Sequence, residues 1–375
     1  MNIVYLIAGT YRPAGMERVL ANKANWLADA GHKVTVITTD QRGRGPAFDM
    51  APSISHQDLA VNYETDNGKP FLLKAVRYPW RRLKHRTRLS KALKSIRPDI
   101  TVSMFCNDAS FLPRINDGSH KVLEVHFSRF KRLQYARSGI WGMADRMLSR
   151  ADARAACRFE RFVVLTNEDA GYWDVPGLRV IPNALTFGDC PPAPLDAKTV
   201  IAVGRYSAQK HFSHLLYAWE LVDPDIRKGW TLRIVGDGEE KEYLESIIGD
   251  KHLSDSVILG PEQNMRKVYN DASVLVLSSR YEGLPMVLLE AQAAGLPVVS
   301  YDCKCGPRDV ITDGVDGYLV PEGRYELIAA RLSALMSDSG LRKRMGAEAY
   351  KASERFSTDR VMSMWSELFE ELCRN

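Results

Sequence analysis

Short apolar runs alternate along the chain with longer segments whose apolar positions follow helical spacing. In the first half the runs predict strands at 2–7, 33–38, 100–105, 121–125 and 162–165. In the second half they predict strands at 199–203, 231–235, 257–259, 274–277, 297–300 and 317–320, separated by helical stretches such as 211–222, 239–249 and 286–294. Strands that alternate with helices are typical of parallel sheets, so we predict two doubly wound α/β domains.

A proline-rich stretch divides the two halves. Loop composition at 180–184 and 191–194 predicts a linker there, which places one domain at 1–185 and the other at 186–356. The tail, 325–373, which begins inside the second domain, is predicted to be helical throughout. Its last part presents Trp365, Leu368, Phe369 and Leu372 as an apolar stripe.

Length and composition set the class of protein. The 375 residues are 45% apolar, enough for two domains of ordinary size. The six cysteines show no repeated paired spacing and the eight histidines no metal-ligand spacing, so a metal site is not expected. No apolar run approaches the roughly 20 residues that cross a bilayer, and residues 1–7 do not form a signal peptide. We therefore expect a cytoplasmic protein with reduced thiols.

Basic residues concentrate in the first half, where residues 1–185 hold 29 Lys and Arg against 17 Asp and Glu. The remainder holds 22 against 29. Residues 74–97 contain many bases and no acid, and after Pro79 their apolar positions fall near one helical face. With Tyr78 and Trp80 at its start, such a helix suits an anionic membrane surface. The bases assigned to this membrane and acceptor side are Arg81, Arg82, Lys84, Arg88 and Lys91.

The basic segment also fits two roles away from a membrane. It can be an edge helix with a solvated basic face, which has no ligand at all. It can also be a nucleic-acid surface, which is disfavoured because no nucleic-acid fold motif accompanies the charge.

Three loops at predicted strand ends carry candidate chemistry. The first follows strand 2–7 and runs to Gly15, where a backbone without a side chain can approach a ligand, although it lacks the dinucleotide fingerprint. His126 directly follows the strand that ends at 125. Arg205 and Lys210 follow strand 199–203 and can clamp two phosphates at the sheet edge where α/β proteins bind ligands.

Two glutamates flank a predicted helix start at 281–290. Gly283 and Pro285 mark a tight turn, so Glu282 lies in the loop and Glu290 about one and a half turns inside the helix. Free backbone amides at a helix start attract phosphate, and two carboxylates there can grip the rest of a ligand. The alternative is one Glu that favours the helix dipole and one solvated Glu.

Taken in order, these segments resemble the retaining GT-B glycosyltransferases of family 4, over nearly the whole chain. The resembling segments are 180–183, 203–205 with Lys210, 234–238, 281–290, 294–299 and 313–317. The resemblance implies two Rossmann-like domains that face a central cleft, an N-terminal one for the acceptor and a C-terminal one for the donor. It also implies that the final helix, 357–375, packs back on the N-terminal domain. The first loop departs from the family's paired glycines, since Ala14 precedes Gly15.

The resemblance assigns the donor's diphosphate to the second domain. Arg205 and Lys210 would neutralise it, and backbone amides at Gly283, Leu284 and Met286 would add hydrogen bonds.

The same resemblance assigns the remaining site residues. Glu282 would bind hydroxyls of the transferred sugar, and Glu290 those of the ribose. Gly15 would let the N-terminal backbone close onto the phosphates, while His126 would border the reacting centre. Catalytic roles are thus expected for His126, Glu282, Arg205 and Lys210.

The implied chemistry is transfer of a hexose-type sugar with retention, without a metal or another cofactor. Front-face attack is expected, in which the leaving phosphate accepts the acceptor's proton. A UDP-sugar is the expected donor, GDP being possible, and a growing polyprenyl-diphosphate-linked glycan in bacterial polysaccharide synthesis is the expected acceptor. The segment 301–308 resembles that of members that build such polymers, and the enzyme would lie peripherally on the inner face of the cytoplasmic membrane. A soluble transferase, a GT-B epimerase and a non-enzymatic polyanion-binding protein are the alternatives.

Overall fold

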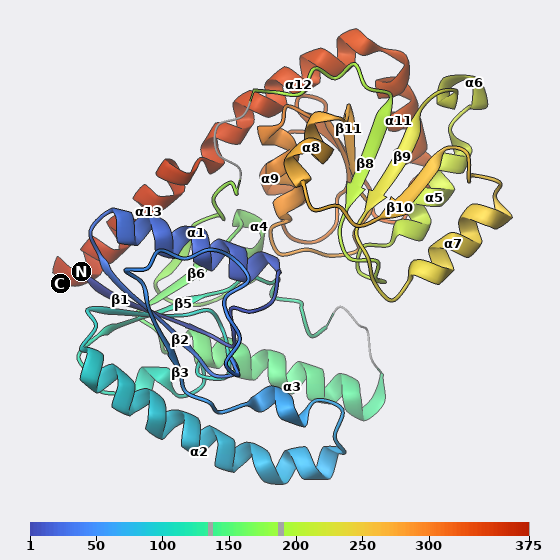
Figure 1. The fold of residues 1–375 in the computed structure, drawn as a ribbon. Coiled ribbons are helices and arrows are strands. Elements are labelled where there is room, and N and C mark those ends of the chain that lie inside the picture. The colour runs from blue at the N-terminus through green and yellow to red at the C-terminus, as the bar shows by residue number, and fades with distance from the viewer. Residues whose placement is uncertain (134–137, 187–190, 375) are drawn as a thin grey trace. The chain divides into compact units, whose positions relative to one another are not determined.

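The computed structural model describes residues 1–133, 138–186 and 191–374. The chain forms two compact units, and the first is discontinuous in sequence. One unit consists of Met1–Ala184 and Asp359–Asn375, and the other of Leu185–Thr358 (Figure 1). Each unit contains its own parallel sheet, which confirms the predicted pair of α/β domains.

The first unit contains a seven-stranded parallel sheet in the order β3-β2-β1-β4-β5-β6-β7. The order reverses beside β1, which pairs with both β2 and β4, so ligand-binding loops are expected at the carboxyl ends of these strands. The strands are β1 (Asn2–Ile7), β2 (Lys33–Thr38), β3 (Ser55–Asp58), β4 (Ile100–Ser103), β5 (His120–Glu124), β6 (Arg161–Val164) and β7 (Leu178–Val180).

Alternating residues of β1 face two separate cores in this unit. Ile3, Tyr5 and Ile7 join a cluster with α1 (Gly15–Asp29) and α13 (Thr358–Arg374). Val4 and Leu6 join a second cluster, on the other face, that includes residues of α2 (Phe71–Ile96) and α3 (Gly139–Ala156). The short helix α4 (Asn167–Ala170) and the 3-10 turns η1 (Tyr63–Asp66) and η2 (Leu112–Arg114) complete the described elements.

Helix α13 completes one core of the first unit although it lies at the end of the chain. Its buried residues Trp365, Leu368, Phe369 and Leu372 form the predicted apolar stripe and pack in the cluster with β1 and α1.

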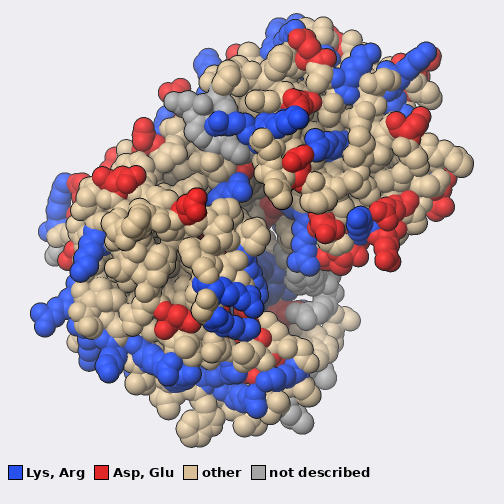
Figure 2. All heavy atoms as spheres, viewed as in Figure 1, with Lys and Arg blue, Asp and Glu red and all other residues tan. Residues whose placement is uncertain are grey.

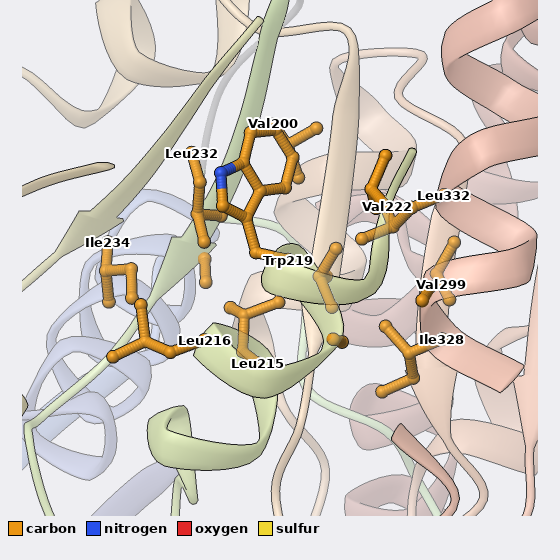
Figure 3. Packing of buried hydrophobic residues seen from close by; sticks show 14 of the residues in the cluster. Val200, Leu215, Leu216, Trp219, Val222, Leu232, Ile234, Val299, Ile328 and Leu332 are labelled. Atoms are coloured by element: carbon orange, nitrogen blue, oxygen red, sulfur yellow. The ribbon is translucent and has the colours of Figure 1, made fainter. Parts of the chain in front are cut away.

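The second unit has a six-stranded parallel sheet in the order β10-β9-β8-β11-β12-β13. Its strands are β8 (Thr199–Val203), β9 (Thr231–Val235), β10 (Val257–Gly260), β11 (Val274–Leu277), β12 (Val298–Tyr301) and β13 (Gly317–Val320). Its helices are α5 (Phe212–Leu221), α6 (Pro224–Arg227), α7 (Lys241–Asp250), α8 (Met265–Asn270), α9 (Met286–Ala293), α10 (Pro307–Val310), α11 (Tyr325–Ser337) and α12 (Ser339–Ser353), followed by the turn η3 (Glu354–Phe356). Trp219 of α5 lies fully buried between strand and helix side chains of this core (Figure 3).

The secondary structure departs from prediction in two places. The sequence does not predict strands β3 and β7, because β3 consists of four exposed residues without apolar alternation and β7 is only three residues long. The tail is helical as predicted, in separate helices, because Asp338 ends α11 and its side chain caps α12. Helix α2 does not begin after Pro79 but at Phe71, so Pro79 lies inside it and the carbonyl of Ala75 has no amide partner one turn on.

Candidate functional site

Loops from four strands meet at the carboxyl edge of the second sheet. The strand order reverses between β8 and β11, the position at which open α/β sheets bind ligands. The loop after β8 is joined to the loop after β11, because the Gln209 side-chain amide donates to the Tyr281 carbonyl at 3.0 Å and the Ser278 hydroxyl to the Lys210 carbonyl at 2.8 Å. The loop after β12 joins them through the Glu282 amide, which donates to the Lys304 carbonyl at 3.3 Å.

Glycines allow these loops to approach so closely. A Cβ at Gly236, after β9, would lie 1.9 Å from the carbonyl oxygen of Gly204, after β8. A Cβ at Gly204 would lie 2.9 Å from Cε of Lys210. Because these positions carry no side chain, the Lys210 side chain can pass over the loop after β8 and reach the end of the neighbouring strand, β11.

Lys210 and Glu282 form an ion pair at this edge. The Lys210 ammonium lies 2.7 Å from Oε1 of Glu282, and both side chains are largely shielded from solvent. The structure thus brings together the residue predicted to bind phosphate and the residue predicted to bind sugar hydroxyls. Each provides the other's counter-charge.

Helix α9 begins directly beside this pair. Its N-cap residue is Pro285, and no side chain caps this end, so its first amides are available to an anion. Gly306 allows the loop after β12 to cover the turn, since it has a φ of 105° and its Cβ would lie 2.5 Å from Cδ of Pro285. Leu284 is buried, and Gly283 and Met286 are partly exposed at the turn.

Glu290 is buried inside α9, and both of its oxygens accept hydrogen bonds. Thr186 Oγ1 donates to Oε1 at 2.8 Å, and the hydroxyl of Tyr269, at the end of α8, donates to Oε2 at 2.6 Å. Both of these hydrogen bonds come from neutral hydroxyl groups, and together they fix the carboxylate. A ligand hydroxyl would have to use the remaining lone pairs or replace Thr186.

Arg205 lies apart from the Lys210–Glu282 pair. Its side chain is 73% exposed and pairs with Glu239, in the loop after β9, at 2.9 Å. The predicted two-base clamp is therefore not assembled in this state. Arg205 would have to leave an exposed partner to bind a phosphate together with Lys210, and exposed pairs of this kind contribute little stability.

In the first unit, Gly15 is the first residue of α1. It is exposed, and a Cβ there would meet nothing within 4 Å, so packing within the structure does not require a glycine. No side chain caps this helix start either, and Glu17 lies buried in its first turn. Burial raises the pKa of Glu17 despite its backbone hydrogen bond and the nearby Arg12 and His126.

His126 belongs to a buried charge cluster at the end of β5. Its Nε2 lies 3.0 Å from Oε1 of Glu124, which also binds the ammonium of Lys23 from α1 at 2.5 Å. Burial acts to raise the pKa of Glu124, but Lys23 and His126 lower it to about 2. Burial lowers the pKa of Lys23, partly offset by Glu124. The carboxylate thus stays ionised and holds the imidazole at the carboxyl edge of the sheet.

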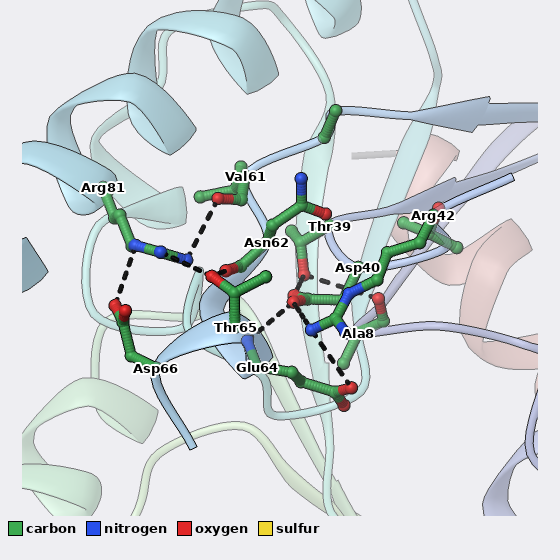
Figure 4. A network of polar contacts seen from close by, with 12 residues as sticks. Ala8, Thr39, Asp40, Arg42, Val61, Asn62, Glu64, Thr65, Asp66 and Arg81 are labelled. Atoms are coloured by element: carbon green, nitrogen blue, oxygen red, sulfur yellow. Dashed lines mark hydrogen bonds and ion pairs between the residues drawn. The ribbon is translucent and has the colours of Figure 1, made fainter. Parts of the chain in front are cut away.

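A polar network holds the segment that precedes α2 against the ends of β1 and β2. The buried Asp40 accepts a hydrogen bond from the Glu64 amide at 2.8 Å, and Arg42 lies 3.7 Å from both carboxylates (Figure 4). With Tyr63, Tyr78 and other residues, Asp40 and Glu64 line a cavity of about 570 Å³ at this edge.

Three of the five bases assigned to a membrane face bind the protein itself. Arg81 pairs with Asp66 at 3.0 Å, Lys84 donates to the Ala60 carbonyl at 2.7 Å, and Arg88 donates to the Leu59 carbonyl at 2.5 Å. Their heads point toward the segment 59–66, as Figure 4 shows for Arg81. Arg82 and Lys91 are exposed without such a contact, and the assignment of the five bases to a membrane and acceptor side stays a prediction.

Sequence reasoning missed the residues that support the predicted ones. Glu124 and Lys23 have a visible signal, since each is a charged residue at a position where the strand or helix pattern requires burial. Tyr269 and Thr186 have none, because only the fold brings them to Glu290. Among the described residues, no group of three or more His, Cys, Asp or Glu side chains could hold a metal ion.

Two family descriptions match the chain, one in each half. "Glycosyltransferase Family 4" matches residues 13–186, and "Glycosyl transferases group 1" matches residues 191–352. A solved structure, S. aureus TarM with UDP, fondaparinux and α-GlcNAc-glycerol, shares the fold, with a TM-score of 0.76, 17% identity, and coverage of 98% of this chain and 99% of that one.

Curated relatives include proteins of bacterial surface-polymer synthesis. An exopolysaccharide phosphotransferase of Streptomyces coelicolor is 38% identical over 62% of this chain and 25% of its own length. The amylovoran biosynthesis glycosyltransferase AmsD of Erwinia amylovora is 35% identical over 56% of this chain and 62% of its own length. The chain thus spans less than two thirds of either of these relatives.

A third relative matches from end to end. It is the Campylobacter jejuni α-1,4-N-acetyl-D-galactosaminyltransferase that acts on GalNAc-α-(1→4)-GalNAc-α-(1→3)-diNAcBac-PP-undecaprenol, 26% identical over 99% of both chains. The two family matches cover nearly the whole chain and correspond to its two parallel-sheet units. The chain therefore belongs to the GT-B glycosyltransferases of the family-4 type.

Proposed function

We propose that this protein transfers a hexose-type sugar from a nucleotide diphosphate sugar to a growing glycan in bacterial polysaccharide synthesis. The observation that carries the proposal is the Lys210–Glu282 pair beside the uncapped start of α9. A diphosphate needs a cation and amide donors, and a sugar needs a carboxylate that accepts from its hydroxyls. On the second unit, the Lys210 ammonium, the Glu282 carboxylate and the start of α9 lie side by side.

Donor binding would exchange partners at this pair. A diphosphate at the start of α9 would compete with Glu282 for the Lys210 ammonium, because both are anions within its reach. Glu282 would then turn to the hydroxyls of the transferred sugar. Glu290, held by Tyr269 and Thr186, would accept from the ribose hydroxyls. The nucleotide we propose is uridine diphosphate.

The transfer we propose retains the anomeric configuration and needs no metal ion. Lys210, Arg205 and the α9 amides would stabilise the negative charge that develops on the leaving diphosphate. The leaving phosphate would take the proton of the attacking hydroxyl on the same face of the sugar. In this scheme His126, held by Glu124, would border the reacting centre, and Gly15 would let the N-terminal backbone close onto the phosphates.

The acceptor we propose is a polyprenyl-diphosphate-linked glycan, bound by the first unit on the inner face of the cytoplasmic membrane. The end-to-end relative from Campylobacter jejuni, which is named for such an acceptor, supports this choice. A soluble acceptor is the competing possibility. Transfer to a glycan that carries a short, water-soluble alkyl diphosphate, compared with the free glycan, separates the two.

Release of nucleoside diphosphate that requires an acceptor tests the function. Lys210→Ala and Glu282→Gln should each lower kcat by about 10²- to 10³-fold, because the first removes a group that stabilises the leaving diphosphate and the second a group that positions the transferred sugar. The exposed Lys267→Ala and Glu245→Gln are matched controls in the same unit and should leave the rate unchanged. Activity should persist in EDTA with UDP-sugars. Wild-type turnover in both site variants, or release without any acceptor, would contradict the proposal.

A further inference from the structure

Helix α2 is too long for the sheet that it covers. Its 26 residues span about 39 Å, whereas strands of four to six residues span about 13–20 Å. Among the residues of α2 whose burial the structure describes, the buried apolar ones, Leu89, Ala92 and Leu93, lie in the C-terminal half. The N-terminal half therefore extends past the sheet, where the strands offer no core to pack against.

Helix α3 lies on the same face and points the same way. Residues of both helices join the same core cluster. Each helix connects parallel strands, so each runs antiparallel to them and begins at the carboxyl edge of the sheet. Figure 1 shows that the first turns of α2 and α3 lie toward the same end of the unit.

The N-terminal half of α2 presents large apolar side chains away from the protein. Val76, Trp80 and Leu83, spaced as i, i+4 and i+7, lie on the side of the helix opposite the buried His85. Each is more than half exposed, Trp80 by 74%. A helix face that is merely solvated would be polar here, so the stripe calls for an apolar partner.

The N-terminal half of α3 repeats this arrangement. Met143 and Met147 lie on the side opposite the buried Ser149 and are 59% and 67% exposed. Two neighbouring helices thus carry apolar tips, which we define as Val76, Trp80 and Leu83 on α2 and Met143 and Met147 on α3.

Behind each apolar tip the same outward face turns basic. On α2, Leu83 and the bases Arg86, Lys91 and Lys94 line a shallow pocket of about 570 Å³. On α3 the exposed Arg150 and Arg154 follow Met147 at helical spacing. Figure 2 shows Lys and Arg side chains in a band along α2 at the lower edge of this unit. Apolar tips followed by bases match the layers of an anionic bilayer, with acyl chains inside and phosphate outside.

We propose that the tips of α2 and α3 insert together into an anionic phospholipid bilayer, with their basic zones at the headgroup phosphates. The proposal deepens the proposed function by naming how a lipid-linked acceptor is reached, yet binding itself needs no catalysis. A second copy of the chain is a poorer partner, because self-association through this face would bring the basic zones together. Among the described residues, no helix is long and apolar enough to cross a membrane.

Sedimentation with vesicles tests this proposal. Wild-type protein should pellet with phosphatidylglycerol–phosphatidylcholine vesicles and much less with pure phosphatidylcholine. Trp80→Ser/Leu83→Ser on α2, and separately Met143→Ser/Met147→Ser on α3, should each reduce the partition coefficient at least tenfold. The control Leu221→Ser/Ile258→Ser removes two apolar residues of the second unit that are also more than half exposed, and it should bind as wild type.

Each remaining result has one meaning. Equal recovery of wild type in the supernatant from both vesicle types overturns the proposal, and wild-type binding by the α3 variant overturns the role of α3. A wild-type dimer in sedimentation velocity that both tip variants abolish would instead assign the face to a second copy. A shift of the unfolding temperature by UDP, unchanged in every tip variant, shows that fold and donor site are intact. Because vesicle binding is measured without substrate, its failure and a failure of transfer are distinguished.

Discussion

At the scale of single residues, the Lys23–Glu124 pair is a buried ion pair of the first unit. Lys23 is 5% exposed and Glu124 1%, and the ammonium also lies 3.8 Å from the Trp365 ring centroid. Desolvation makes such a pair costly to break, because the Glu124 carboxylate would be left buried with only the His126 imidazole beside it. The pair joins α1, β5 and α13 at one point.

Lys23→Met should destabilise the first unit by about 3–5 kcal/mol at pH 7. The pKa of Glu124 is lower in the folded than in the unfolded chain, so its stabilising contribution is complete above about pH 4.5 and is lost as the pH falls toward 2. The difference in unfolding free energy between Lys23→Met and wild type should therefore shrink as the pH falls through that range. Urea unfolding at pH 7 and pH 3 measures it.

The double variant Lys23→Met/Glu124→Gln is the control for this prediction. It removes both charges and should recover part of the lost free energy. A single variant as stable as wild type at pH 7 would show that the pair is not buried as described.

Residue patterns predicted part of the candidate site. Lys210 and Glu282, 72 positions apart, do meet, because their strands are neighbours in the sheet. Arg205 was grouped with Lys210 by proximity in sequence, yet it turns to Glu239 on another loop. Spacing along the chain identifies which loop carries a side chain but not the direction in which that side chain points.

At the scale of elements, α2 is anchored by its inner face. His85 is 2% exposed, lies 3.2 Å from the Tyr63 hydroxyl and packs edge-on against Phe111. The same face directs Arg81, Lys84 and Arg88 to the segment 59–66. A sequence pattern shows the basic content of a helix, but it cannot show that carbonyl groups of a neighbouring segment will bind those bases.

Acidification should loosen α2 through His85. Burial lowers its pKa to about 4, so the unfolded chain takes up more protons than the folded one between about pH 6.5 and 4. The stability of the first unit should fall over that range by about 3 kcal/mol from this group alone. His85→Phe cannot titrate and should show a shallower slope in urea unfolding across these pH values.

Asp108 must be considered in the same experiment. Burial raises the pKa of Asp108 to about 6, so this group makes the folded state more stable as the pH falls. Asp108 is present in both wild type and His85→Phe, so its contribution cancels in the difference between their unfolding free energies. An identical slope for wild type and His85→Phe would contradict the buried, neutral imidazole.

At the scale of the whole molecule, two compact units, each with its own sheet and core residues, predict two separate unfolding events. Phe369 is fully buried in the core of the first unit, so Phe369→Ala should lower only that unit's transition, by about 3–5 kcal/mol. UDP should raise only the other transition, because a ligand stabilises the unit that binds it. Scanning calorimetry of the full chain measures both. A shift of both transitions together would contradict this independence.

The α/β architecture of both units could be predicted from apolar runs because buried parallel strands are apolar on both faces. The edge strand β3 could not, because all of its residues are exposed and it carries no apolar alternation to mark its pairing with β2. The overhang of α2 also escaped prediction. Proline usually marks a helix start, and only the structure shows that eight residues of helix precede Pro79.

The position of α13 has a consequence for synthesis in the cell. Ribosomes make a chain from its N-terminus, and domains generally fold as they emerge. The second unit, Leu185–Thr358, is complete before α13 has been made, whereas the first unit still lacks Trp365 and Phe369 from one of its cores. The domain that is translated first is therefore finished last, and until then its partly open core is the surface that chaperones would have to protect.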